Sequence, residues 1–335
     1  MEQRTNLFRE LIKYPEIVAF LKGSESMKKI FALLPNLTLD RKVLYESLYS
    51  NVGDTSVSTI QLPNNNKLFV KMECENGMGN NHYSRYWLVH LALAEAFGLI
   101  KNGDTTILEI TSGSSGIALS MACEQLGYKL KIIVPETLPK GRIDAMTRES
   151  TTIVKVPGYI ANCKSFFLKE KDKADYYLPN HSEEKADLIS SVFSRVAYEF
   201  VEKYGSVDNV LLGLGNGSST YGVSKVFKYQ DPKCKVYSFY PSSSSNMIVY
   251  GLYADNLPFK HINLAQKETL IDRELYIDNI KLENVYELFI GSPVVKEWGH
   301  SSLYALLMAS KIAEKKCGES FFSIAYDKIE RYSNE

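Results

Sequence analysis

The sequence lacks both a surplus of either charge and any long hydrophobic run. Its 335 residues carry 39 Lys and Arg against 39 Asp and Glu, so the formal net charge is zero. A neutral chain has no bulk electrostatic attraction for nucleic acid or for an anionic membrane. No apolar run approaches the length that spans a bilayer, and the N-terminus has no apolar signal core. We therefore expect a soluble cytoplasmic protein that binds neither nucleic acid nor membranes.

Cysteine is scarce and widely spaced. The chain has five cysteines, and no two of them form a Cys-x-x-Cys pair. This pattern is typical of neither a disulfide framework nor a zinc site, so we expect a reducing compartment and no metal. The length is sufficient for one large domain or two ordinary ones around a proper core.

The sequence does contain a regular alternation of strands and helices. Residues 3–50 have helical spacing, interrupted at Pro15, and form a predicted N-terminal helical extension. From residue 53 onward short strands alternate with helices, which is typical of a parallel α/β sheet. The predicted strands are 57–62, 68–72, 105–110, 131–134, 152–156, 209–212, 235–240, 283–289 and 320–325. The predicted helices are 85–97, 117–126, 140–148, 161–171, 186–204, 221–229 and 301–314.

Two turns at the carboxyl ends of predicted strands, residues 111–116 and 213–220, are rich in glycine and hydroxyl groups. Such a loop presents backbone N–H groups at a helix N-terminus, where the helix dipole favours a phosphate or a carboxylate. Ordinary turn chemistry explains one such loop, but two on one parallel sheet indicate a ligand with two anionic ends. The second loop lacks the lysine of a GxxxxGK[ST] phosphate loop, so a nucleotide is the weaker hypothesis.

The stretch 71–87 ends a strand, breaks at two glycines and begins a helix, which is where ligands bind in α/β chains. His82 is either a polar capping residue or a catalytic group. Tyr83 is either a proton donor or a core aromatic. Arg85 binds either a carboxylate or an acidic neighbour.

Several motifs in the same order resemble the fold type II pyridoxal-phosphate enzymes, the tryptophan synthase β-like superfamily that includes cysteine synthase and cystathionine β-synthase. The resemblance extends from about residue 53 to residue 333, and it is specific because the motifs are collinear. They are Gly-Asp-Thr-Ser at 53–56, Lys-Met-Glu at 71–73, Thr-Ser-Gly-Ser-Ser-Gly at 111–116, Pro-Glu-Thr at 135–137, Val-Pro-Gly at 156–158, the loop 213–222, Gly-His-Ser-Ser at 299–302 and Glu-Arg-Tyr at 330–332.

The resemblance implies an α/β fold of two open parallel-sheet domains with helices on both faces, besides the N-terminal extension of residues 1–50. A smaller domain, 76–180, would carry a loop for the substrate carboxylate. A larger domain, 51–75 with 181–335, would carry a loop for the cofactor phosphate. The resemblance also implies a homodimer and a small amino-acid substrate.

The implied cofactor is pyridoxal 5′-phosphate, held without a covalent bond. Ser114 stands where the family has an asparagine facing the ring hydroxyl. Asp327 stands about where a serine meets the pyridine nitrogen, and a carboxylate there would favour a protonated ring. The residues implied to hold the phosphate are Gly215, Asn216, Gly217, Ser218 and Ser219. Those implied to bind the substrate are Thr111, Ser112 and Ser115 at its carboxylate, with Asn180 near the position of the family's substrate-wall glutamine.

The family's Schiff-base lysine has no counterpart in this sequence. Its position is His82 when counted without a gap from Glu73, and Tyr83 when one inserted residue is allowed before Arg85. No lysine lies between residues 71 and 101, and the lysine at 71 matches a different family residue. The chain is therefore predicted to form no internal lysine aldimine.

Three functions fit these residues. In the first, which we favour, the chain is an atypical lyase or transferase. His82 or Tyr83 then shuttles protons at Cα during β-elimination or β-replacement on a serine- or cysteine-like amino acid. In the second, it is a non-catalytic pseudoenzyme that binds a ligand or a partner. In the third, the 213–220 loop binds an anionic substrate directly, without a cofactor.

Overall fold

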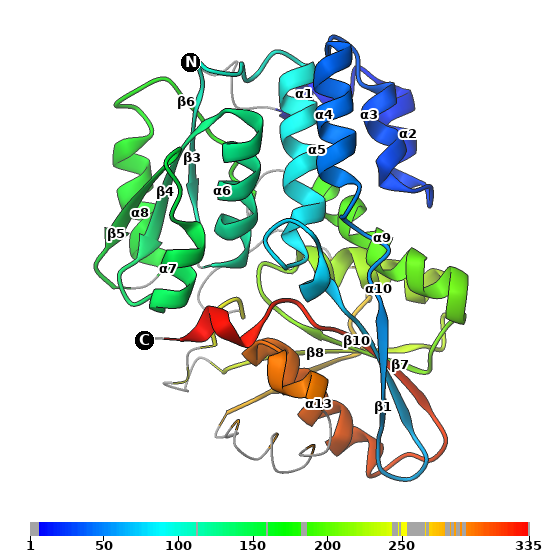
Figure 1. Cartoon of the computed structure of the whole chain (residues 1–335). Helices are drawn as coiled ribbons and strands as arrows, with labels where there is room; N and C mark the ends of the chain where they lie inside the picture. The colour runs from blue at the N-terminus through cyan, green and yellow to red at the C-terminus, as the bar shows by residue number, and fades with distance from the viewer. Residues whose placement is uncertain are drawn as a thin grey trace. The chain divides into compact units, whose positions relative to one another are not determined.

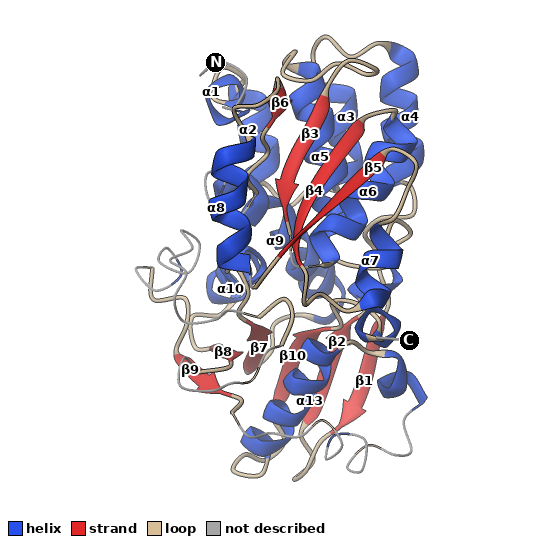
Figure 2. Cartoon of the chain, turned by 90° about the vertical axis from the view of Figure 1, so that its left-hand side faces the viewer, coloured by secondary structure: helices blue, strands red, loops and turns tan. Residues whose placement is uncertain are grey.

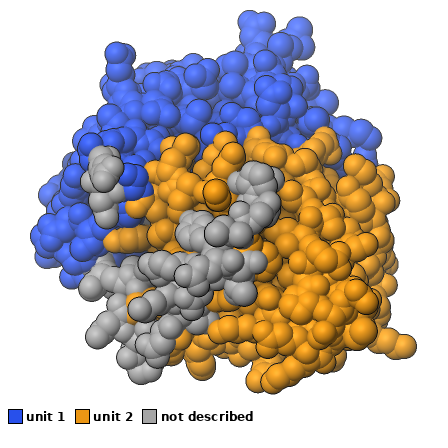
Figure 3. Space-filling model, turned by 60° about the horizontal axis from the view of Figure 1, so that its bottom comes forward, with its two compact units in different colours: residues 1–53, 76–188, 333–335 blue, residues 54–75, 189–332 orange. Residues whose placement is uncertain are grey.

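The computed structural model describes residues 7–111, 113–158, 160–181, 186–242, 247, 249–252, 265, 268–278, 282, 285, 289 and 293–333. The chain forms two compact units, which Figure 3 colours separately. The first unit comprises Met1–Gly53, Asn76–Leu188 and Ser333–Glu335, and the second comprises Asp54–Glu75 and Ile189–Tyr332. Among the described residues, no helix is both long enough and apolar enough to cross a membrane.

A four-stranded parallel sheet forms the centre of the first unit, with the strand order β5-β4-β3-β6. Figure 2 shows helices α6 and α8 on opposite faces of this sheet. Leu108, Ile133 and Phe167 belong to the apolar cluster between the sheet and α8. The element bounds are β3 Thr106–Ile110, α6 Ser114–Leu126, β4 Lys129–Pro135, α7 Lys140–Met146, β5 Thr151–Val156, α8 Ile160–Glu170 and β6 Tyr176–Tyr177.

The N-terminal helices pack on α5 of the first unit (Figure 1). Their bounds are α1 Leu7–Leu11, α2 Pro15–Lys22, η2 Met27–Lys29, α3 Ile30–Leu33 and α4 Leu39–Tyr49, and α5 is Tyr83–Ala96. The helical run is interrupted before Pro15, as predicted: α1 ends at Leu11, and Pro15 begins α2, where the first helical position needs no backbone N–H.

The Glu95 carboxylate on α5 anchors α4. Arg41 donates to both of its oxygens, from Nε at 2.7 Å and from Nη2 at 2.6 Å. The Tyr45 and Tyr128 hydroxyls donate to Oε2 at 2.8 and 2.7 Å. Burial alone would raise the pKa of the Glu95 carboxyl, but the hydrogen bonds from Arg41, Tyr128 and Tyr45 outweigh it and hold the pKa below its usual range.

We expect Glu95→Gln to lower the free energy of unfolding by about 2–3 kcal/mol, because it leaves the Arg41 guanidinium without its carboxylate. A lowered folded-state pKa gives stability that is present above the unfolded value of about 4.3 and is lost as the pH falls through the folded value. The difference between variant and wild type should therefore shrink in acid. Urea denaturation at a series of pH values measures it.

The matched control for Glu95→Gln is Glu10→Gln. Glu10 lies on α1 and forms a solvent-exposed ion pair with Lys13, which follows that helix. The expected effect of Glu10→Gln is below about 1 kcal/mol. A Glu95→Gln variant as stable as this control would contradict the anchoring role.

A six-stranded sheet forms the centre of the second unit, with the strand order β1-β2-β10-β7-β8-β9. Strand β1 is antiparallel to β2, and the remaining pairs are parallel. The strand bounds are β1 Val57–Gln61, β2 Lys67–Lys71, β7 Asn209–Gly213, β8 Lys235–Tyr240, β9 Arg273–Tyr276 and β10 Ser320–Ile324. The helix bounds are η3 Glu73–Glu75, α9 Ala186–Tyr204, α10 Ser218–Gln230, η4 Pro293–Glu297, α13 His300–Ala313 and η5 Ile329–Tyr332.

Alternate residues of the central strands face opposite layers of this second unit, as the period of two requires. Val210 and Leu212 of β7 join the cluster with Phe200 of α9 and Phe227 of α10. Leu211 between them joins the cluster that contains α13. The sheet is therefore covered on both faces, which confirms the predicted layered α/β fold.

Five details differ from the sequence predictions. The two glycine-rich loops follow strands of two sheets, not one, and the β1–β2 hairpin adds an antiparallel edge to the second sheet. No strand was predicted where β6 and β9 lie, and β9 pairs through exposed or half-buried residues that give little hydrophobic signal. The strand predicted for 283–289 is wrong at its described residues, because Val285 is helical and its carbonyl oxygen accepts from the Phe289 N–H at 3.1 Å. The rest of that segment lies outside the described residues.

Candidate active site

The 111–116 loop of the first unit joins β3 to α6 and is held by its own hydroxyl groups. The Thr111 Oγ1 accepts hydrogen bonds from the backbone N–H groups of Gly113 and Gly116, both at 3.2 Å. The Trp87 indole N–H donates to Ser115 Oγ at 3.1 Å. Ser112 lies outside the described residues. These bonds fix the loop at the start of a 13-residue helix, where the dipole favours an anion.

The guanidinium of Arg142 lies directly against this loop. Arg142 is on α7 and is 1% exposed. Gly113 has φ +151, and a Cβ built on it would overlap the guanidinium, so only glycine fits beside this cation. A Cβ on Gly116 would likewise overlap the Thr111 side chain. The loop thus combines oriented N–H groups with a buried positive charge, which suits a carboxylate.

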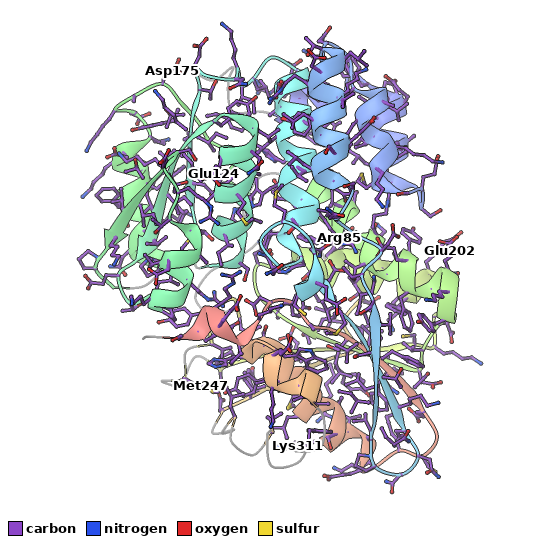
Figure 4. The ribbon with its side chains drawn as sticks, in the orientation of Figure 1. Arg85, Glu124, Asp175, Glu202, Met247 and Lys311 are labelled. Atoms are coloured by element: carbon purple, nitrogen blue, oxygen red, sulfur yellow. The ribbon has the colours of Figure 1, made fainter. Side chains whose placement is uncertain are left out.

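Helix α5 begins two residues earlier than predicted, so His82 and Tyr83 lie at a helix start. His82 is the N-cap, without a side-chain capping bond, and Tyr83 is the first helical residue. The Asn81 side chain accepts from the Tyr83 backbone N–H at 2.9 Å, and Ser84 Oγ donates to the Asn81 carbonyl at 2.8 Å. Arg85 is buried, and Figure 4 labels it near the first turn of α5.

The structure brings His181 to Tyr83. Their rings meet edge to face with centroids 5.6 Å apart, and the His82 and Tyr83 rings lie 4.4 Å apart. Nδ1 of His181 is 3.3 Å from Oε2 of Glu109, at the end of β3. Asn180, predicted near the substrate wall, has φ +48 and immediately precedes His181.

The 213–220 loop of the second unit joins β7 to α10. Gly217 has φ +84, and a Cβ on Gly215 would overlap the Gly251 carbonyl oxygen. The Asn216 side-chain oxygen accepts from the Ser218 N–H at 3.0 Å and from the Ser218 hydroxyl at 2.7 Å. Ser219 is half-buried. The loop is therefore a rigid turn with bare backbone at the start of a helix.

Asp327 of the second unit is buried behind Gly299. The Tyr332 hydroxyl lies 3.1 Å from Oδ1 of Asp327, to which it donates, and a Cβ on Gly299 would overlap the same oxygen. The Tyr332 ring in turn contacts the His300 ring, with centroids 4.0 Å apart. The Gly-His-Ser-Ser and Glu-Arg-Tyr motifs therefore meet around one carboxylate. Its predicted place at the pyridine nitrogen stays a prediction.

Three residues of these sites were missed from the sequence: Arg142, Trp87 and Glu109. Each acts through a partner far along the chain, so no local pattern marks it. In the part of the chain that the structure describes, no group of three His, Cys, Asp or Glu residues is placed to hold a metal ion.

Comparisons with known proteins give one consistent family. A family model described as "Pyridoxal-phosphate dependent enzyme" matches residues 50–270. Cysteine synthase of Staphylococcus aureus is 27% identical over 277 residues, covering 79% of this chain and 87% of the relative. Cystathionine beta-synthase of Dictyostelium discoideum is 24% identical over 314 residues, covering 87% of this chain and 61% of the relative.

Solved structures show the same fold. A hydrogen sulfide-producing enzyme from Fusobacterium nucleatum matches with a TM-score of 0.74 and 25% identity, covering 85% of this chain and 98% of that chain. O-ureido-L-serine synthase matches with a TM-score of 0.74 and 22% identity, covering 85% and 92%.

Proposed function

From the premise that the chain belongs to the family of pyridoxal-phosphate dependent enzymes, we propose that it catalyses β-elimination or β-replacement on a serine- or cysteine-like amino acid, without a lysine bound to the cofactor. The observation that carries the proposal is a contrast within the chain. The described residues of both predicted anion loops are held by hydrogen bonds at a helix start, whereas no lysine lies between residues 71 and 101. His82 or Tyr83 would take over the movement of protons.

The family implies pyridoxal 5′-phosphate as the cofactor, and the second unit fits it. Gly215 and Gly217 expose bare backbone at the N-terminus of α10, and the turn between Asn216 and Ser218 keeps that backbone in place. Such a loop suits a phosphate. When bound, the cofactor supplies an electron sink for the pair of electrons left on the substrate Cα.

The chain's own residues would hold the substrate and move its protons. The 111–116 loop and Arg142 would bind the carboxylate and so orient the Cα–H bond. Either the imidazole of His82 or the phenol of Tyr83 would move the proton at Cα. The centroids of the two rings lie 4.4 Å apart.

Lys71 is not a substitute for the missing lysine. Its Nζ donates to the Thr55 carbonyl and hydroxyl oxygens, both at 2.6 Å, and lies 2.9 Å from a Glu199 carboxylate oxygen. The side chain is 2% exposed. An amine held in this way is charged and enclosed, which makes it a poor nucleophile for a cofactor carbonyl.

The test is spectroscopic. Purified protein with added cofactor should show visible absorbance that an added amino acid shifts, yet borohydride should fix no cofactor to the chain, as intact mass measures. His82→Lys and Tyr83→Lys follow as variants, and only one of them should regain borohydride-fixable cofactor. A purified protein that does not bind added cofactor would contradict the proposal.

The second candidate, a pseudoenzyme, is favoured by the same absent lysine. It predicts that amino acids bind at the 111–116 loop without turnover. Amino-acid turnover that disappears on changing His82 or Tyr83 would exclude it. A homodimer in the cytoplasm remains our expectation from the family resemblance and the cysteine pattern, and light scattering would measure the oligomer.

A further inference from the structure

A cluster of imidazole and phenol rings, buried except for the half-buried Tyr83, lies at the N-terminal half of α5 in the first unit. Tyr83, Tyr86 and His90 come from α5, Tyr177 from β6, and His181 from the segment after it. The ring centroids of His181 lie 5.6 Å from Tyr83 and 6.4 Å from Tyr86. Titratable rings rarely gather in a core unless each one has a partner.

His90 is fully engaged within this cluster. Its Nδ1 lies 2.6 Å from the Tyr86 hydroxyl, and its Nε2 lies 2.8 Å from the Tyr177 hydroxyl. Burial raises the pKa of both phenols, Tyr86 and Tyr177, above their usual value, so both stay neutral. His90 therefore braces α5 against β6 with both nitrogens, and it has no ring nitrogen left for a substrate.

The backbone of His181 is held by Glu109. Its N–H donates to Oε2 of Glu109 at 3.3 Å, and Nδ1 of the ring lies 3.3 Å from the same oxygen, outside hydrogen-bond geometry. Glu109 is 3% exposed, and its other oxygen accepts from the Ile110 N–H at 2.9 Å. The bond to the backbone therefore fixes the position of the segment that carries the imidazole. The left-handed backbone of Asn180 further sets the direction of His181.

His181 also connects Tyr83 to the carboxylate loop. The His181 ring packs on Trp87 with centroids 5.5 Å apart, and the Trp87 indole N–H holds Ser115 Oγ. Glu109 stands two residues before Thr111 on the same strand end. One imidazole thus touches the first residue of α5 and, through Trp87, the loop proposed to hold the substrate.

We propose that His181, locked by Glu109, is a positioning residue that orients the Tyr83 phenol relative to the carboxylate loop, and that Tyr83 rather than His82 carries the transferred proton. This proposal rests on the proposed function. The groups that face His181 are Glu109 from β3 and Tyr83, Tyr86 and Trp87 from α5. The described ring contact of His82 is with Tyr83, at 4.4 Å between centroids.

The test compares His181→Gln, Glu109→Gln and the control Glu170→Gln. Glu170 is a buried carboxylate of the same unit that pairs with Lys131 on β4 and with Lys173. In histidine ¹⁵N spectra we expect the His181 ring signals of the wild type to be kept in Glu170→Gln and displaced in Glu109→Gln. Tyrosine ¹³C spectra should show a displaced Tyr83 ring signal in His181→Gln and Glu109→Gln only.

Kinetics provides the second readout. His181→Gln should lower kcat for the amino acid by about 10- to 100-fold with little change in KM, because the reacting group is misplaced while the carboxylate loop remains. In a Tyr83→Phe background, His181→Gln should lower kcat no further. Additive losses would overturn the proposal.

The two proposals fail in different ways. If the wild-type protein turns over no amino acid, the proposed function falls, and the spectra alone decide the positioning role. A Tyr83 signal that moves in both variants supports it, and one that is unchanged by both overturns it.

Discussion

Tyr83→Phe is expected to lower amino-acid turnover by about 100- to 10,000-fold, the range that a positioned proton-transfer group contributes. The substitution removes only the hydroxyl, so the ring contacts with His82 and His181 are kept. The backbone bond from the Tyr83 N–H to the Asn81 side chain is also unaffected. The loss should therefore appear in turnover, measured as 2-oxoacid release, while cofactor absorbance and the free energy of unfolding stay at wild-type values.

His82→Gln is the matched control for Tyr83→Phe. His82 makes no side-chain capping bond to α5, so glutamine should preserve the helix start. We expect turnover within about tenfold of wild type, since the proton-transfer group itself is kept. If His82→Gln abolishes turnover and Tyr83→Phe does not, His82 transfers the proton. The positioning role proposed for His181 is then wrong, because His181 contacts Tyr83.

The layered fold could be predicted because its signals are local. The strands that carry both anion loops, β3 and β7, are short apolar runs that end in glycine and hydroxyl residues, and the following helices begin at those residues. The continuous apolar burial of β7 and the helical spacing of α13 both follow from residues close together in sequence. Element ends shifted by a few residues, which moved Tyr83 from a loop into α5.

The geometry of the sites could not be predicted, because it depends on contacts between distant residues. Arg142 reaches Gly113 across 29 positions, and His181 reaches Glu109 across 72. Asp327 meets Gly299 across 28 positions. The sequence predicted which loops would bind an anion, whereas the residues that pack against those loops could be identified only from the fold.

Lys71 shows the same difference between what a local pattern suggests and what distant contacts decide. A scan for an amine near the cofactor motifs selects Lys71, which ends β2 in the right part of the chain. In the structure its ammonium donates to Thr55 and pairs with Glu199. Oε2 of Glu199 also accepts from the Asp54 N–H at 3.0 Å. The Gly-Asp-Thr-Ser motif is therefore tied to α9 through this lysine, which makes the role of Lys71 structural.

Glu199→Gln should consequently lower the free energy of unfolding by about 3–5 kcal/mol, because it leaves the Lys71 ammonium charged at 2% exposure with only neutral oxygens beside it. Lys71→Met combined with Glu199→Gln should cost less than Glu199→Gln alone, since no buried charge is then left over. Urea denaturation measures both.

Lys71→Met should also leave the borohydride result unchanged, with no cofactor fixed to either protein. If borohydride fixes cofactor to the wild-type protein but not to Lys71→Met, Lys71 is the Schiff-base lysine. The proposal of a chain without such a lysine is then wrong.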